Sequence, residues 1–335
     1  MSGQPANRSR CLSRALAILS MAAFTAAASC PSLAQTAAPT KVKVGVLFLG
    51  GATNVYAAQK LGYFQRENLD VELRSLGGGA QVVPLMISGD VNIGMINQVS
   101  WMLALAQGYD LVAVAATSAE KKDPPYANNI FVTQDSPIRT AKDLEGKRIS
   151  TNTLNNILTL YTNEWARKNG ADPKKYQWTE VPFPQMPDTL INQRIDAAFM
   201  VEPFGTVAQS SGKVRVMASP MAEVYPKGLF FSVLASNRDW LNSNTDIVKR
   251  FVGALQQAHN VLQKDEKQRL EFIAEFTKMK PDLVEKLIND DLVVQIDPAA
   301  ISLTGDLMLK DGLLKSKLDM EKYIWKDAPR IPAMR

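Results

Sequence analysis

The side chains in this sequence that could do chemistry are few and lie far apart. The sole histidine, His259, falls in a late helical segment, where a lone histidine is usually a surface or boundary residue. Of the acidic pairs, Asp290 with Asp291 is typical of a solvated helix end, and only Asp188 with Glu202 is expected near a cleft. No Gly-x-Ser-x-Gly, His-Glu-x-x-His or phosphate-loop lysine motif is present. The sequence therefore indicates no catalytic residue, no metal site and no cofactor.

Glycine, amide and hydroxyl side chains instead gather in six short turns. None of these turns contains Lys or Arg. Glycine lets the backbone approach a ligand closely, the N–H groups at a helix start hold polar oxygens, and amides both donate and accept hydrogen bonds. We expect a pocket that recognises its ligand by shape and hydrogen bonds. The turns span residues 48–54, 77–81, 97–101, 151–156, 183–188 and 201–205.

Each of these turns also has a purely structural interpretation. Asn97 and Gln98, like Thr151 to Thr153, are equally suited to capping helices. Gly77 to Gly79 lacks the third glycine of a dinucleotide-binding motif, so it is either a simple loop or a ligand contact. Glu202 is either a satisfied carboxylate behind the pocket or a group that faces the cleft. In the second case it favours a ligand with an amine or another N–H donor.

Alternating strand and helix patterns must position these turns. Such an order requires a parallel sheet covered on both faces, with the ligand at the carboxyl ends of the strands. A second unit begins near Ser136, with an amphipathic helix over residues 155–168, and the chain is mostly helical after Trp240. The predicted strands are residues 41–48, 69–73, 91–96 and 111–116, then 147–150, 177–183, 195–201, 213–217 and 229–235.

Length and composition exclude several classes of protein. A chain of 335 residues suits two lobes rather than one core, and 46% hydrophobic with 21% charged residues is ordinary for a soluble globular protein. The net charge of +5 includes Arg8, Arg10 and Arg14. Three of the 38 basic residues thus lie in the first 34 positions, so 35 remain against 33 acidic residues, a net charge of +2. No clustered basic face for nucleic acid is expected.

The first 34 residues are typical of a secretory signal peptide. The three arginines precede an apolar run over residues 15–28, and small residues lead up to Ala34, where we predict cleavage. A retained membrane anchor or a lipid on Cys30 are the alternatives. Both cysteines, Cys11 and Cys30, lie in this segment, so the mature protein is expected to have no disulfide and no thiolate nucleophile. The predicted location is the periplasm.

Four segments in the right order carry a resemblance to a known family. They are AAQKLGYFQRENLDVEL at residues 57–73, SGDVNIGMI at 88–96, QDSPIRTAKDLEGKRIST at 134–151 and INQRIDAAFMVEPF at 191–204. Together they resemble the taurine, alkanesulfonate and nitrate solute-binding family, which also includes binding proteins for thiamine-pyrimidine precursors. The resemblance implies an α/β type II periplasmic-binding fold, in which two α/β lobes joined by two crossing strands close on a ligand.

The resemblance also implies where the lobes and the ligand lie. The crossings are expected near residues 130–135 and 229–235, which places lobe 1 at 41–132 and 233–335 and lobe 2 at 133–232. By position, the ligand shell falls on Phe48, Gly51, Asn54, Gly78, Gly79, Asn97, Gln98, Thr151, Asn152, Thr153, Gln185 and Glu202.

The function implied by the resemblance is that of a non-enzymatic, monomeric subunit that hands a small solute to an ABC permease and its ATPase, without a cofactor. The turn at 151–156 departs from the alkanesulfonate branch, and the absence of Lys and Arg from the turns argues against nitrate. A nitrogen-bearing organic ligand fits the amides and Glu202 better. A ligand-sensing subunit of a signalling system is an alternative. A pyrimidine synthase of the yeast thiamine type shares the fold, but its cysteine-rich motif is missing.

Overall fold

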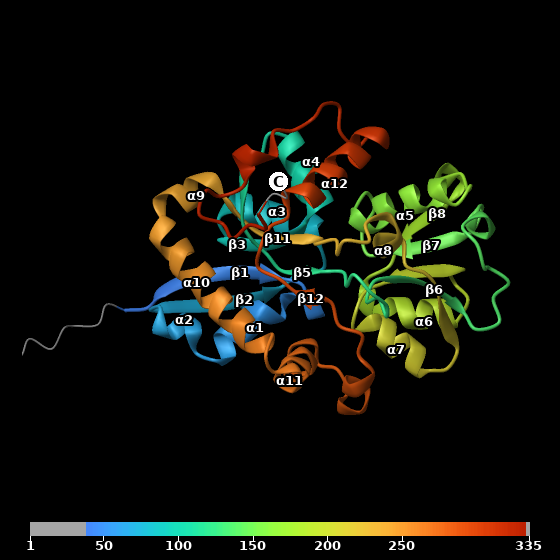
Figure 1. Ribbon diagram of the computed structural model, residues 1–335, viewed down its shortest axis with the longest axis horizontal. Coiled ribbons are helices and arrows are strands. Elements are labelled where there is room, and N and C mark those ends of the chain that lie inside the picture. Colours follow the sequence, from blue (N-terminus) through green and yellow to red (C-terminus); the bar gives the residue numbers. More distant parts are fainter. Residues whose placement is uncertain (1–37, 333–335) are drawn as a thin grey trace, which may run out of the picture. The chain divides into compact units, whose positions relative to one another are not determined.

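The computed structural model describes residues 38–332, which contain two five-stranded sheets (Figure 1). We call the part of the molecule built on each sheet a lobe. The first sheet has the order β2-β1-β3-β11-β4 and the second has the order β10-β6-β9-β7-β8. The first consists of β1 (Thr40–Val46), β2 (Leu69–Ser75), β3 (Ile93–Asn97), β4 (Leu111–Ala116) and β11 (Ser232–Asn237). The second consists of β6 (Asn129–Thr133), β7 (Arg148–Thr151), β8 (Gln177–Glu180), β9 (Ala197–Met200) and β10 (Val214–Ala218).

Both sheets are mixed, which corrects the all-parallel arrangement predicted from the sequence. β1 is parallel to β2 and β3, but β11 is antiparallel to β3 and β4. Likewise β7 is parallel to β8 and β9, but β6 is antiparallel to β9 and β10. The antiparallel strands are those by which the chain arrives from the other lobe. Such a strand needs no helical crossover within its sheet, so it can run antiparallel to its neighbours.

The lobes are joined where two chain segments pass side by side. Glu120 N donates to Leu229 O at 2.8 Å, and Thr117 N donates to Ser232 O at 3.2 Å. A short third strand, β12 (Asp291–Leu292), pairs with β5 (Ser118–Ala119) in the same region. The first crossing predicted at residues 130–135 is therefore wrong, because β6 lies wholly inside the second sheet.

Helices cover the sheets, and the C-terminal helices return to the first lobe (Figure 1). α10 packs on α1 and α2, α12 packs on α4, and α5 packs on α8. The last segment also joins the first sheet, since Trp325 N donates to Ala113 O at 2.9 Å. The helices are α1 (Thr53–Lys60), α2 (Tyr63–Arg66), α3 (Gly79–Ser88), α4 (Gln98–Ala106), α5 (Ile157–Lys168), α6 (Met186–Ile191), α7 (Phe204–Ser210), α8 (Pro220–Val224), α9 (Arg238–Ser243), α10 (Thr245–Leu262), α11 (Glu266–Thr277) and α12 (Pro298–Lys310). The 3-10 turns are η1 (Gly50–Ala52), η2 (Lys142–Leu144), η3 (Pro173–Lys175), η4 (Phe183–Gln185), η5 (Pro281–Lys286) and η6 (Met320–Tyr323).

Local sequence explains where the helices next to the lobe junction begin. The Asn97 side chain accepts from Ser100 N at 3.0 Å and so caps α4. Asn156 caps α5 by accepting from Leu158 N and Thr159 N, and Thr159 bonds back to complete a capping box. Neither Thr53 nor Asn54 caps α1, because this helix continues directly from η1.

The buried core follows the predicted apolar stripes. Every residue of β4 is buried, as expected of a strand covered on both faces. Trp101 is fully buried and its indole N–H donates to Leu111 O at 2.9 Å, so it is a core residue. Within residues 38–332, none of the helices is long and apolar enough to cross a lipid bilayer. The signal peptide, both cysteines and the cleavage site predicted after Ala34 lie outside the described residues.

Candidate functional site

A cavity of about 60 Å³ lies where the lobes meet, beside the crossing segments. It receives side chains from the ends of β1 and β3, from the turns after β7 and β9, and from the crossings themselves. Ligand pockets usually enclose several hundred Å³, so this volume corresponds to a nearly closed cleft. The lining residues are Leu47, Leu49, Gly51, Gly78, Met95, Asn97, Asn128, Asn152, Asn156, Ile157, Leu158, Phe183, Val201, Glu202, Met221, Phe231, Ser232 and Asp290.

Five of the residues proposed from the sequence lie on the wall of this cavity: Gly51, Gly78, Asn97, Asn152 and Glu202. They come from both lobes, and Asn152 spans the gap by donating from Nδ2 to Gly77 O at 3.4 Å. Gly51 is close-packed, because a Cβ there would lie 2.4 Å from Ser118 Oγ. Their contact with a ligand remains a prediction.

Three proposed residues sit just behind the cavity wall. Asn54 is buried and its Nδ2 donates to Val293 O at 3.2 Å. Gln98 is buried and donates from Nε2 to Phe230 O in the second crossing. Thr151 accepts from Asn156 Nδ2 at 3.1 Å. These side chains support the wall and the crossings.

Three others lie elsewhere. Phe48 packs edge-on against Phe276 of α11, with ring centroids 4.9 Å apart. Gln185 is exposed on η4, and Thr153 lines a separate outer groove. The remaining proposed residue, Gly79, is the first residue of α3.

Several wall residues lie outside the six predicted turns and reach the wall through tertiary contacts. Asn128 and Asp290 belong to no motif, and they meet across 162 residues of sequence. The interpretation of Asp290 and Asp291 as a solvated helix end is wrong: Asp290 is 8% exposed, and Asp291 begins β12. The apolar run after Asp291 was the available signal, because it marks a buried strand rather than a surface helix.

One carboxyl oxygen of Glu202 has no hydrogen-bond donor in this cavity. Its Oε2 accepts from Thr206 N at 3.2 Å, whereas its buried Oε1 has no hydrogen-bond partner. Burial, opposed by the bonds to Thr206, raises the pKa of Glu202 to about 8, and the charge of Glu120 adds to the rise. Asp188, which was expected near the same cleft, is exposed on α6 and does not line the cavity.

Two more carboxyl groups share one amide beside the crossing. Asn128 Nδ2 donates to Glu120 Oε2 at 2.9 Å and to Asp290 Oδ1 at 2.8 Å. Burial raises the pKa of both carboxyls, and the neighbouring charge of Glu120 raises that of Asp290 further. Neither group forms a salt bridge in the described part of the chain. Among the described residues no group of His, Cys, Asp and Glu is placed to hold a metal ion.

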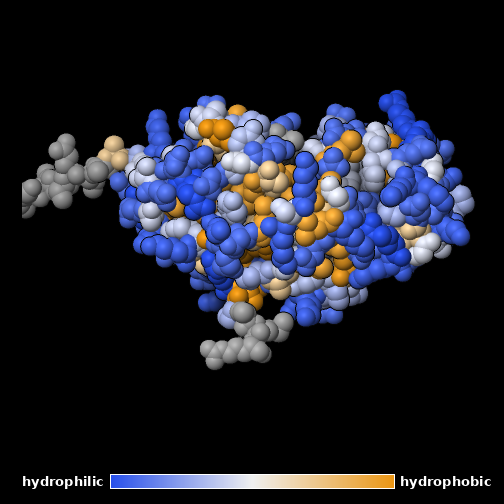
Figure 2. Space-filling view, turned by 90° about the horizontal axis from the view of Figure 1, so that it is seen from above, coloured by the Kyte–Doolittle hydropathy of each residue, from blue (hydrophilic) through white to orange (hydrophobic). Residues whose placement is uncertain are grey.

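Figure 2 shows apolar side chains gathered in the middle of one face, with hydrophilic residues on either side. An outer groove of about 570 Å³ runs between α3, α4 and the turn after β7. Its walls include Ile87, Tyr109 and Leu154, which are 40 to 46% exposed. It holds no charged residue, and its polar side chains are Ser88, Ser100, Gln107, Tyr109, Thr153 and Asn155.

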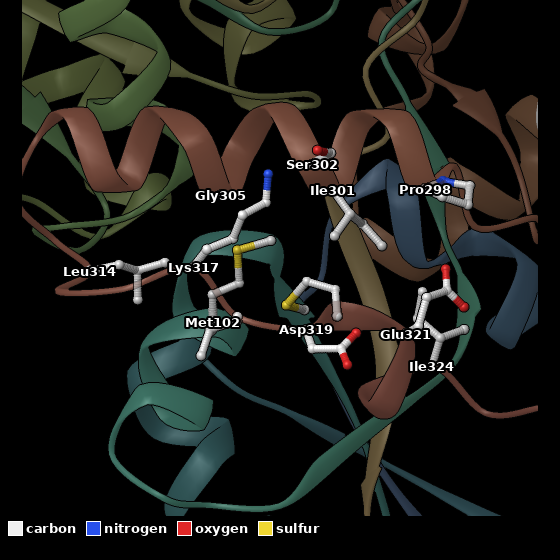
Figure 3. A pocket seen from close by; sticks show the side chains of 12 residues that line it. Met102, Pro298, Ile301, Ser302, Gly305, Leu314, Lys317, Asp319, Glu321 and Ile324 are labelled. Carbon is white, nitrogen blue, oxygen red and sulfur yellow. The ribbon is translucent and has the colours of Figure 1, made fainter.

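Another hollow, of about 420 Å³, lies between α4, α12 and residues 314–324 (Figure 3). Its charged side chains are already paired with one another or with neighbours: Lys317 with Asp306, and Asp319 with Lys322. All its lining residues come from the first lobe, so closure of the lobes would not enclose a ligand there. The cleft cavity is therefore the better candidate site.

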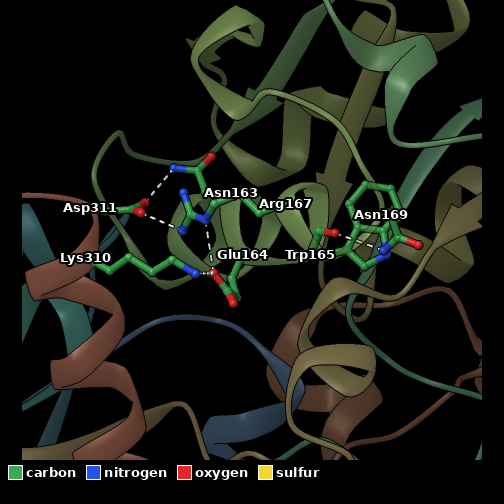
Figure 4. Close-up of polar contacts among 7 residues, drawn as sticks. All are labelled: Asn163, Glu164, Trp165, Arg167, Asn169, Lys310 and Asp311. Carbon is green, nitrogen blue, oxygen red and sulfur yellow. Dashed lines mark hydrogen bonds and ion pairs between the residues drawn. The ribbon is translucent and has the colours of Figure 1, made fainter.

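Next to the cavity, α5 of the second lobe is tied to the end of α12 (Figure 4). Arg167 Nη2 lies 2.6 Å from Asp311 Oδ1, and Lys310 Nζ lies 2.6 Å from Glu164 Oε2. Arg167 also contacts Glu164 within α5, and Tyr161 hydroxyl bonds Thr304 Oγ1 at 2.9 Å. These polar contacts join the two lobes in addition to the crossing segments.

Residues 51–268 match the model of the family described as NMT1/THI5-like. The chain belongs to this family. The suspected resemblance is thus confirmed, since the family's relatives include sulfonate- and nitrate-binding proteins.

Two curated relatives show the range of the family. The chain is 21% identical over 254 residues to a putative aliphatic sulfonates-binding protein of Escherichia coli, covering 74% of this chain and 77% of that protein. It is also 21% identical over 248 residues to the yeast 4-amino-5-hydroxymethyl-2-methylpyrimidine phosphate synthase THI11 of Saccharomyces cerevisiae, covering 71% and 68%. Binding proteins and an enzyme thus share the family's fold.

Solved structures confirm the type II periplasmic-binding fold. The alkanesulfonate-binding protein SsuA of Xanthomonas axonopodis, bound to MOPS, superposes with a TM-score of 0.72 at 19% identity, covering 86% of this chain and 99% of that one. The periplasmic nitrate-binding protein NrtA of Synechocystis superposes with a TM-score of 0.72 at 13% identity, covering 86% and 87%. At these identities the likeness defines the fold and not the ligand.

Proposed function

We propose that this chain is the extracytoplasmic solute-binding subunit of an ABC importer. The observation that carries the proposal is the cavity at the lobe junction, whose walls come from both lobes and from the segments that join them. A ligand held there would bridge the lobes and favour the closed form, and a binding protein delivers its ligand to a permease in that form. The binding proteins among the relatives and solved structures support the same role.

The cavity's composition supports small organic solutes. Apolar side chains such as Leu47, Met95 and Phe231 surround a few amide and carboxyl groups. Such a wall binds the body of a ligand by burial and orients it through few hydrogen bonds. Sulfonate, nitrate and pyrimidine-type solutes are the classes that the family brings into consideration.

A synthase role is the second candidate, because THI11 is a relative. The chain's sole histidine, His259, is half-buried on α10 and does not line the cavity, and its only cysteines precede residue 31. A binding role needs neither residue, so we propose that the protein is not an enzyme.

The decisive measurement is thermal unfolding of the exported protein, refolded to remove carried solute, against a panel of solutes. A ligand at 100 times its Kd adds about 2.7 kcal/mol, which raises the midpoint by roughly several degrees at this size. A shift with one solute class supports the proposal. Cooperative unfolding without a shift for any class contradicts it, and turnover of a bound solute would favour the synthase.

Export, lobe limits and oligomeric state belong to the same proposal. We propose cleavage after Ala34, with lipid attachment at Cys30 as the alternative, and the mass of the periplasmic protein distinguishes them. We further propose lobe limits that follow the two sheets, which moves residues 129–132 from the expected lobe 1 (41–132 and 233–335) to lobe 2 (133–232), and a monomer in solution. Light scattering of the exported protein tests the monomer.

A further inference from the structure

We propose that the solute bound in the cleft is an organic cation, whose positively charged N–H group binds Glu202 beside the Glu120–Asn128–Asp290 cluster. This inference rests on the proposed function, because it names the chemical class of ligand for the same cavity. It differs from the anionic ligands named for SsuA and NrtA.

The first observation is the unpartnered acceptor. Glu202 is 4% exposed, lines the cavity, and leaves Oε1 without a hydrogen bond. A buried carboxyl oxygen without a hydrogen-bond donor raises the free energy of the protein. A ligand that supplies an N–H there removes this cost, which favours its binding. A charged donor gains more than a neutral one, because such bonds are shorter and stronger.

The second observation is that three carboxyl groups meet with no basic side chain to balance them. Asp290 lines the cavity next to Glu202, and Glu120 lies behind it in the first crossing. They are close enough for their charges to raise one another's pKa. No Lys, Arg or His is among the described residues that line the cavity. Burial favours the protonated form of these carboxyls, and an organic cation bound beside them would favour the ionised form of Glu202 and pair with its charge.

The third observation is that three amide side chains of the cavity wall already donate to partners within the protein. Asn97 donates to Ser100 Oγ, Asn128 to its two carboxyls, and Asn152 to Gly77 O. Two of the helix starts beside the cavity are capped by side chains, because Asn97 caps α4 and Asn156 caps α5, whereas α3, with Gly78 at its N-cap, has no side-chain cap. An anion near Glu202 and Asp290 would therefore meet carboxyl groups and amides whose N–H groups already have partners.

The remaining wall residues indicate the shape and polarity of the rest of the ligand. Leu49, Ile157 and Phe231 present apolar surface, so the cation is expected to carry an apolar or planar group. A bare metal ion does not fit such a wall, and no cluster of metal-ligating side chains exists among the described residues.

The test uses two sets of probes, similar in size within each set, that carry a positive charge, no charge or a negative charge. The larger set is benzamidine, benzamide and benzenesulfonate, and the smaller set is guanidinium, urea and nitrate. Calorimetry on the exported protein is expected to give the order cation, neutral, anion in at least one set. Glu202→Gln is expected to weaken binding of the cation by about 10- to 100-fold and to leave the neutral isostere within a fewfold.

The matched control is Glu285→Gln, which removes the same charge at an exposed position outside the cavity. It is expected to bind all six probes like the parent. Tightest binding of an anion, or a Glu202→Gln variant that holds the cation as well as the parent does, would overturn the cation inference while leaving the proposed solute-binding function in place. Binding of none of the six probes by a cooperatively folded protein would overturn the inference, and the wider solute panel then decides the function separately.

Discussion

Arg167 on α5 and Asp311 at the end of α12 form an ion pair of 2.6 Å across the two lobes, although 144 residues of sequence separate them. The Asp311 side chain is 9% exposed and the Arg167 side chain 28% exposed, so water screens the pair only in part. Together with Lys310 and Glu164, this pair holds the two lobes together outside the crossing segments.

Removing this contact should favour the open form. Arg167→Ala is expected to weaken solute binding by about tenfold and to increase the radius of gyration of the solute-free protein in small-angle scattering. Arg148→Ala is the matched control, because Arg148 forms a comparable pair with Asp196 within the second lobe. An equal loss of affinity in both variants would show that the effect is general destabilisation and not opening of the lobes.

Stability should fall as the pH rises through the neutral range. Glu202 has an ordinary pKa of 4.5 when unfolded and about 8 when folded, because burial disfavours its charge. Between these values the folded protein holds a proton that the unfolded chain has lost, so the free energy of unfolding decreases with pH. Urea unfolding at several pH values measures this slope.

Urea unfolding of variants at several pH values shows which carboxyl group causes the slope. Glu202→Gln should be less dependent on pH than the parent, with a residual slope from Glu120 and Asp290, whose pKa values burial also raises. Glu285→Gln should keep the parent's slope. A Glu202→Gln variant that loses stability with pH as steeply as the parent would contradict the assignment.

The turn after β1 should tolerate a methyl group at one glycine and not at the next. A Cβ on Gly51 would lie 2.4 Å from Ser118 Oγ in β5, whereas a Cβ on Gly50 would meet nothing within 4 Å. Gly51→Ala is expected to cost about 1–3 kcal/mol and Gly50→Ala much less, as measured by urea unfolding. Adding Ser118→Ala should restore part of the loss in Gly51→Ala, and the absence of any rescue would show that the contact is not the cause.

The shared amide of Asn128 should contribute to the free energy of unfolding. Asn128→Ala leaves Glu120 and Asp290 without their common donor, and a loss of about 1–3 kcal/mol is expected in thermal or urea unfolding. Adding Asp290→Asn should recover part of the loss, because it removes one charge and supplies a new amide. Asn242→Ala, at an exposed position of α9, is the control and should be nearly neutral.

Local patterns in the sequence determined most of the elements and the family. The alternating run of β1, the apolar run of β4 and the stripe on α5 are each set by neighbours two to four residues away, so their periodicity predicts them directly. The polar turns after β1, β3, β7 and β9 were placed for the same reason, and they supply Gly51, Asn97, Asn152 and Glu202 to the cavity wall.

Only the tertiary structure decided how the lobes are joined and which charges meet. The first crossing lies near Glu120 rather than at residues 130–135, because backbone pairing with residues 229–232 defines it and no local pattern records that pairing. Asp290 looked solvated in sequence, and it is buried because Asn128, 162 residues away, donates to it. Burial and pKa depend on what lies across space, so the acidic character of this cavity follows from the packing of the lobes and crossings and not from any one segment.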